Sequence, residues 1–169
     1  MTATETAASA LSEQQLNQLM QYTIEAYKTF EKYAENLSNP IAAQMFKQFA
    51  VDERATRDLI EKKIAASGTA RSRVTLANDL AFQDILEGDL SYRETTEFLI
   101  ARERTMERKL AELGRGATVI DRGFVVYLGA SKRAHIVELE RELELTKIDR
   151  DWFKREDAEA RLVRGPATP

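Results

Sequence analysis

The 169-residue sequence contains no cysteine, and this absence removes several kinds of chemistry. The chain has no disulfides, no thiolate metal ligands and no cysteine nucleophile. Glycine and proline are also scarce, with seven and three residues, and two of the prolines lie among the last four residues. Because glycine and proline are the residues that interrupt helices, their scarcity favours long helices.

Long apolar runs and an excess of one charge are missing too. No run approaches the roughly 20 apolar residues that span a bilayer, and the start MTATETAASALS has neither the basic nor the apolar part of a secretory signal. The 25 basic and 28 acidic residues are mixed along the chain, with a net charge of −3 and no basic stripe. We therefore expect no nucleic-acid partner and no membrane partner, with the cytoplasm as the default location.

The remaining composition is that of an ordinary globular protein. Hydrophobic residues make up 43% of the chain and charged residues 31%, which together with the length predicts one domain with a buried core. We expect a disordered lead-in over residues 1–11, a helical domain over residues 12–163 and a disordered tail over residues 164–169.

Four segments carry apolar residues at the alternating spacing of three and four that is typical of packed helices. Ser12 and Asn39 are expected to cap the first two helices, Gly68 to end the second, and Asp89 or Ser91 to cap the third. Gly114 is expected to end the third helix, and the fourth begins near residue 121. Weak periodicity near residues 76–86 indicates a short extra helix, and residues 148–153 indicate a C-terminal helical extension.

The expected architecture is all-α, a four-helix bundle with one long crossover. About twenty residues separate the second helix from the third. A short loop would make these helices antiparallel neighbours, whereas a connection of this length lets the third helix cross the bundle.

A layer of polar side chains interrupts the apolar stripes near the middle of all four helices. Carboxylates and lysines are almost never fully buried unless they are paired or bound to a metal. Two helices carry polar pairs at i and i+3, which stack on one helix face and so reach a common centre. Di-iron and di-manganese bundles use this geometry, with Glu from two helices and Glu-x-x-His from the other two. The layer comprises Thr23, Glu53, Thr56, Glu103, Lys132 and His135.

Four stretches resemble the helices of the rubrerythrin branch of the ferritin-like superfamily. They are EAYKTFEKYAE, FKQFAVDERATRDLIEKK, FLIARERTMERKLAELG and YLGASKRAHIVELEREL. The similarity covers roughly residues 12–145, apart from the crossover. The resemblance implies a ferritin-like bundle, a homodimer and a di-metal site in the polar layer.

Matched residue by residue, the chain keeps half of the ligands that the resemblance implies. The retained ligands are Glu53, Glu103 and His135, and the losses fall mainly on one of the two metal positions. Two carboxylates and one imidazole can hold a single divalent ion, iron or manganese or else zinc, with open positions. The replaced positions are Thr23 and Lys132, each in place of a glutamate, and Thr56, in place of a histidine.

Two interpretations of the layer stay open. In the first, which we favour, no cofactor binds: Lys132 pairs with Glu53 or Glu103, and His135 completes the hydrogen bonding. Such a network persists because removing one partner of a buried ion pair costs about 3–5 kcal/mol. In the second, one divalent ion binds to Glu53, Glu103 and His135. An ammonium beside a divalent cation disfavours the second interpretation, although a desolvated lysine can lose its proton.

Three classes of function follow, and none has an assigned catalytic residue or substrate. The first, which we favour, is a non-catalytic structural or interaction protein, with the C-terminal extension around Trp152 and Phe153 as one surface for a protein partner. The second is an iron- or manganese-dependent oxidoreductase that handles oxygen or peroxide through one metal. The third is a small-ligand-binding bundle. A cavity beside Thr23 and Thr56 would favour the third class, and a dry, close-packed layer the first.

Overall fold

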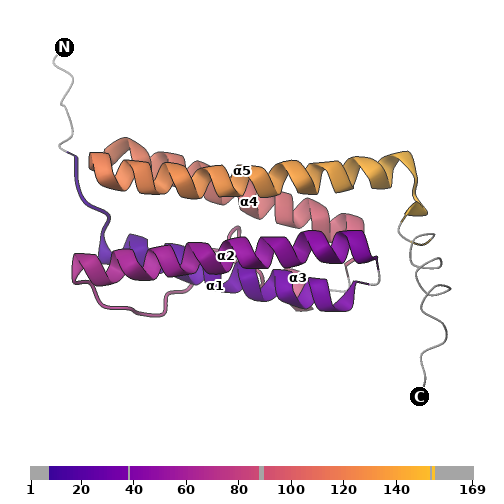
Figure 1. Ribbon diagram of the computed structural model, residues 1–169, viewed down its shortest axis with the longest axis horizontal. Coiled ribbons are helices and arrows are strands. Elements are labelled where there is room, and N and C mark those ends of the chain that lie inside the picture. Colours follow the sequence, from indigo (N-terminus) through magenta and orange to yellow (C-terminus); the bar gives the residue numbers. More distant parts are fainter. Residues whose placement is uncertain (1–7, 38, 88–89, 153, 155–169) are drawn as a thin grey trace, which may run out of the picture.

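The computed structural model describes residues 8–37, 39–87, 90–152 and 154. These residues form helices and no strand, so the all-α prediction is confirmed. The four long helices lie side by side as two antiparallel hairpins, α1 with α2 and α4 with α5 (Figure 1). The helices are α1 (Glu13–Asn36), α2 (Pro40–Ser67), α3 (Gln83–Glu87), α4 (Tyr92–Gly116) and α5 (Val119–Ile148).

Local sequence signals account for most helix ends. Ser12 caps α1 in a capping box with Gln15, whose backbone N–H donates to the Ser12 hydroxyl. The Asn39 side chain caps α2, and Ser91 caps α4. Gly68 ends α2 in the left-handed conformation at φ 66°, which glycine adopts without strain. The predictions at these ends are confirmed.

Gly114 does not end α4, which continues to Gly116. Gly114 is buried and helical, and a Cβ on it would lie 3.2 Å from Cγ2 of Val125. This glycine therefore permits the close approach of α4 and α5 rather than a turn. The expected helix near residues 76–86 is also shorter than predicted, because only α3 forms there.

A long crossover connects α2 to α4, as predicted, and runs back along the bundle so that α2 and α4 point the same way (Figure 1). Its apolar side chains enter the core. Asn17 of α1 fixes its start, because the Asn17 amide donates to the Ala70 carbonyl at 2.9 Å and accepts from the Ser72 N–H at 2.8 Å. The buried crossover and α3 side chains are Leu76, Leu80, Phe82 and Ile85.

The described part of the N-terminal segment differs from the expected lead-in. Residues 8–11 contact the α4–α5 turn: the Ser9 N–H donates to the Gly116 carbonyl at 3.0 Å, and Leu11 is buried. The expected lead-in therefore does not extend to residue 11. The rest of it, Phe153, most of the C-terminal extension and the expected tail lie outside the described residues. No described helix is both long and apolar enough to cross a membrane.

Replacing Asn17 with alanine tests how the crossover is held. Asn17 is fully buried, so Asn17→Ala leaves the Ala70 carbonyl and the Ser72 N–H without their partner. We expect the free energy of unfolding, measured with urea, to fall by about 2 kcal/mol. The exposed Gln14→Ala serves as the matched control, and equal stability of the two variants would contradict this account.

Candidate functional site: a buried Lys–Glu–Glu–His cluster

The structure brings the six residues of the predicted polar layer to one level of the bundle, and all six are buried. Each of the four long helices contributes at least one of them, because each has a polar residue at a core position of its apolar stripe. Glu53 of α2 and Glu103 of α4 have no exposed surface at all. Two ionised carboxylates in the centre of a bundle require nearby positive charge.

Lys132 of α5 provides that charge. Its ammonium forms an ion pair with Oε1 of Glu53 and lies 3.6 Å from Oε2 of Glu103. It also lies 5.0 Å from the centre of the Tyr22 ring, a cation–π distance. The ammonium is therefore held between both carboxylates and over an aromatic face.

His135 lies one turn further along α5 and contacts carboxylates with both ring nitrogens. Its Nδ1 is 3.2 Å from Oε2 of Glu103 and 3.6 Å from Oε1 of Glu53, and its Nε2 is 3.2 Å from Oδ2 of Asp52. The ring packs on Phe49, with ring centres 4.2 Å apart. Burial alone would lower the pKa of His135, but the hydrogen bonds to Asp52 and Glu103 outweigh it and raise the pKa to about 9.

The carboxylates differ in how well their charge is stabilised. Burial would raise the pKa of Glu103, but Lys132, His135 and a hydrogen bond from the Tyr22 hydroxyl hold it below its usual value. Burial raises the pKa of Glu53, and its Oε2 has no hydrogen-bond partner among the described residues. Burial would likewise lower the pKa of Lys132, but the two carboxylates raise it. With Lys132 and His135 both protonated, two positive charges offset the two buried glutamates, and Asp52, whose pKa the hydrogen bond to His135 lowers, adds a negative charge at the partly exposed edge of the site.

Two members of the site lie outside the six predicted residues. Tyr22 donates from its hydroxyl to Oε1 of Glu103 at 2.6 Å, although a tyrosine at helical spacing is ordinarily a core residue. Asp52, which is partly exposed, fixes the outer nitrogen of His135. Tyr22 is adjacent to Thr23, a signal that could have included it. Asp52 has no such signal, because its contact depends on how far the imidazole of α5 reaches toward α2.

The two threonine positions enclose almost no space. Thr23, Thr56 and Lys132 line a cavity of about 10 Å³, closed by Tyr22 and apolar side chains. A cavity of this size holds at most one water molecule. The layer is therefore close-packed on the side where a second metal ligand set would lie, and this feature disfavours a small-ligand site beside Lys132.

Glu53, Glu103 and His135 form a group that could hold one metal ion, since one ligand atom from each lies within 4.8 Å of the others. Asp52 holds Nε2 of His135, as carboxylates do for metal-bound histidines, and so directs Nδ1 toward the two glutamates. These residues suit one divalent ion and do not identify it. They do not suit two ions, because the other positions hold two threonines and a lysine. A single ion would also lie close to the Lys132 ammonium, which is paired with Oε1 of Glu53.

The fold and this cluster define the class: an all-helical bundle with a charge-compensated polar layer in its core. Comparison with known families finds no family model that matches the chain, and comparison with curated proteins finds no significant match. The resemblance to the rubrerythrin branch therefore rests on the four helical stretches and the position of the polar layer.

The raised pKa of His135 predicts a loss of stability in mild base. An unfolded histidine titrates near 6.5, so the contribution of protonated His135 is complete below about pH 6.5 and is lost as the pH rises through about 9. We expect the free energy of unfolding of the metal-free protein to fall by about 3 kcal/mol over this range. His135→Gln should lack this part of the pH dependence. An identical pH dependence in both proteins would contradict the assignment, and the NMR signal of this sole histidine gives its pKa directly.

Lys132→Met is expected to destabilise the protein strongly, although the lysine and methionine side chains are similar in size. Without the ammonium, Glu53 and Glu103 share a buried site with one fewer positive charge, which should lower the free energy of unfolding by about 3–5 kcal/mol. The double variant Glu53→Met, Lys132→Met removes both charges of the pair and should recover most of that loss. Urea unfolding near neutral pH measures all three proteins. A single variant as stable as the wild type would show that the ion pair is not required.

Proposed function

We propose that this chain is a non-catalytic ferritin-like protein, with a structural or interaction role, in which fixed side-chain cations take the place of a di-metal centre. The ion pair of Lys132 with Glu53 carries the proposal. In the rubrerythrin pattern, position 132 holds a glutamate that would bind metal. Here the side chain at the same position supplies positive charge itself.

The electrostatics of the cluster support this role. Two buried carboxylates without compensation would be strongly unfavourable, and Lys132 together with protonated His135 neutralises both. Neither an ammonium nor an imidazolium can change oxidation state or donate a lone pair to a metal ion. The cluster joins α1, α2, α4 and α5 through charged and polar contacts, and its side chains pair with one another.

The shape of the site supports the same conclusion. The cavity beside Thr23, Thr56 and Lys132 is about 10 Å³, which leaves no room for an oxidisable substrate or for a small organic ligand. All four core members of the cluster are at most 2% exposed. A role at the surface of the bundle therefore agrees better with the structure than chemistry in its interior.

A mononuclear metal protein is the second candidate, and two observations favour it. Oε2 of Glu53 is buried without a hydrogen-bond partner among the described residues, and Asp52 orients His135 as it would a metal ligand. Glu53, Glu103 and His135 would hold the ion, and an iron or manganese ion would supply redox chemistry with oxygen or peroxide. Asp52 would keep a proton on Nε2 and leave the Nδ1 lone pair for the metal. The Lys132 ammonium would repel the ion unless it moved away or lost its proton.

Metal content per chain decides between the two candidates. Protein expressed with added iron, manganese and zinc is measured by mass spectrometry, alongside the triple variant Thr23→Glu, Thr56→His, Lys132→Glu. We expect far less than one metal per wild-type chain and two per chain of the triple variant, because the variant restores the ligand types of the family pattern.

The metal content of the wild type and that of the triple variant test different parts of the proposal. One metal per wild-type chain, lost in His135→Ala, would replace the first candidate with the second. A triple variant that retains its helix content by circular dichroism but binds no metal pair would contradict the residue-by-residue match to the family. Adding Glu103→Gln to the triple variant is the control, since it removes a ligand without changing the size of the side chain.

A further inference from the structure

The solvent-facing side of α5 is unusually apolar. Ten large apolar side chains are exposed among the described residues, and six of them belong to this one helix. A helix at the edge of a bundle normally presents charged and polar residues to water. Concentrated exposed apolar surface instead marks an interaction site. The six residues are Val119, Ile120, Val126, Tyr127, Val137 and Ile148.

An uncharged seam runs along this side of α5. Its members are separated by steps of 3, 4, 3, 4 and 3 residues, which is the heptad spacing of a helix that packs against another helix. The opposite side of α5 carries Leu128, Lys132 and Leu139 into the core, so the seam is not used within one chain. The α5 seam comprises Ile120, Gly123, Tyr127, Ala130, Ala134 and Val137, all of them exposed.

Gly123, a member of the seam, has no packing role within one chain. A glycine inside a helix costs about 1 kcal/mol relative to alanine. A Cβ on Gly123 would meet no atom within 4 Å, so packing within the chain does not require glycine there. The close approach of a second helix would explain a small residue at this position, and likewise at Ala130 and Ala134.

The order of large and small residues along the seam fits the seam of a second copy of this chain when the two helices run antiparallel. We place the two-fold axis midway between Tyr127 and Ala130. In an antiparallel pair, Tyr127 of each copy then faces Ala130 of the other copy. Ile120 then faces Val137, and Gly123 faces Ala134. Parallel pairing would instead place tyrosine against tyrosine and glycine against glycine, with a clash in one layer and a gap in another.

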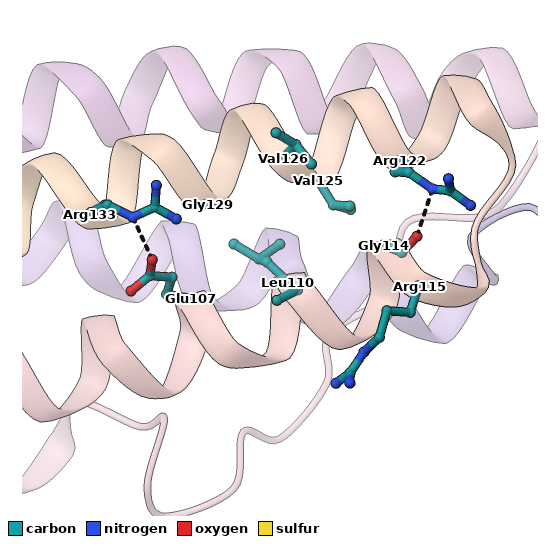
Figure 2. Close-up of a pocket in the computed structure, with 10 residues that line it drawn as sticks. Glu107, Leu110, Gly114, Arg115, Arg122, Val125, Val126, Gly129 and Arg133 are labelled. Carbon is teal, nitrogen blue, oxygen red and sulfur yellow. Dashed lines mark hydrogen bonds and ion pairs between the residues drawn. The ribbon is translucent and has the colours of Figure 1, made fainter.

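Charged residues flank both ends of the seam. Arg115 and Arg122 flank its N-terminal end and lie at one end of the α4–α5 groove (Figure 2). At its C-terminal end, Glu138 is paired with Arg141, Glu144 with Lys147 and Glu140 with Arg104 of α4. This end is therefore largely neutralised within one chain, and the direction of pairing rests on the order of large and small residues.

The groove in Figure 2 extends the apolar surface from α5 onto α4. It has a volume of about 490 Å³ and is lined by Leu110, Val126 and Gly129 between its charged ends. At the end away from Arg115, Arg133 is paired with Glu107 at 2.8 Å. The groove is continuous with the seam through Val126, so a helix on the seam covers part of it as well.

We propose that the α5 seam is a self-association surface, through which two copies of this chain pair antiparallel about a two-fold axis. Such an interface is isologous, since each contact occurs twice. The inference names the partner for the interaction role proposed above. The two ideas can fail separately, because mass in solution tests the partner and metal content tests the core.

A charge at the centre of the seam tests the proposal. The full chain is measured by size-exclusion chromatography with light scattering, and we expect twice the 19.2 kDa mass of one chain. Ala130→Glu introduces two like charges near the two-fold axis and should give the mass of one chain at the same concentration. The control is Ala55→Glu, an exposed alanine in the middle of α2, which should remain dimeric. Circular dichroism confirms that both variants keep their helices.

Cysteine cross-linking tests the direction, because the natural chain contains no cysteine. The double variant Ile120→Cys, Val137→Cys should form a disulfide-linked dimer under mild oxidation, whereas neither single variant should. Cross-linking of a single variant would overturn the antiparallel arrangement. A monomeric wild type would overturn the proposal, as would a dimer insensitive to Ala130→Glu, which would place the contact elsewhere, for example at the C-terminal extension.

Discussion

The ion pair between Lys132 and Glu53 is the interaction on which the rest of the core depends. It joins α5 to α2 in the middle of the bundle, where both side chains are out of contact with water. Removing charges from water is costly, and this pair is weak evidence for high stability in itself. Its importance is conditional: once Glu53 and Glu103 are buried together, the fold requires a cation between them. His135 and Tyr22 then bind the two oxygens of Glu103, whereas Oε2 of Glu53 has no hydrogen-bond partner among the described residues.

The polar layer could be predicted from the sequence because charged and polar residues stand at regularly spaced positions that are normally apolar in a packed helix. A glutamate, a lysine or a histidine at the core position of an apolar stripe is conspicuous, and three helices carry such residues at the level where the fourth carries Thr23. The helix caps were predictable for a similar reason, since Ser12, Asn39 and Ser91 satisfy backbone N–H groups within a few residues of themselves. Both kinds of signal are local in the chain.

What could not be predicted depends on contacts between distant segments. Asp52 belongs to the site only because the ring of His135 reaches it across a helix interface. Gly114 was expected to end a helix. A glycine can either end a helix or let a neighbouring helix approach closely, and the sequence does not show which of these applies. Its second use, allowing Val125 to approach, becomes visible only when α4 and α5 are placed together. The pairing state of Lys132 with a particular glutamate likewise depended on the three-dimensional arrangement.

The distribution of residue types around α5 has a consequence for how this helix finds its rotational setting. Its buried side includes Asp121, Lys132, His135 and Glu142, whereas its outer side includes isoleucine, tyrosine and valine. Burial of apolar surface alone therefore discriminates poorly between the native orientation and one turned about the helix axis. The attraction of Lys132 and His135 to the carboxylates of α2 and α4 supplies the missing preference. On α5, this electrostatic attraction acts together with the burial of Val125, Leu128 and Leu139 to set which face points inward.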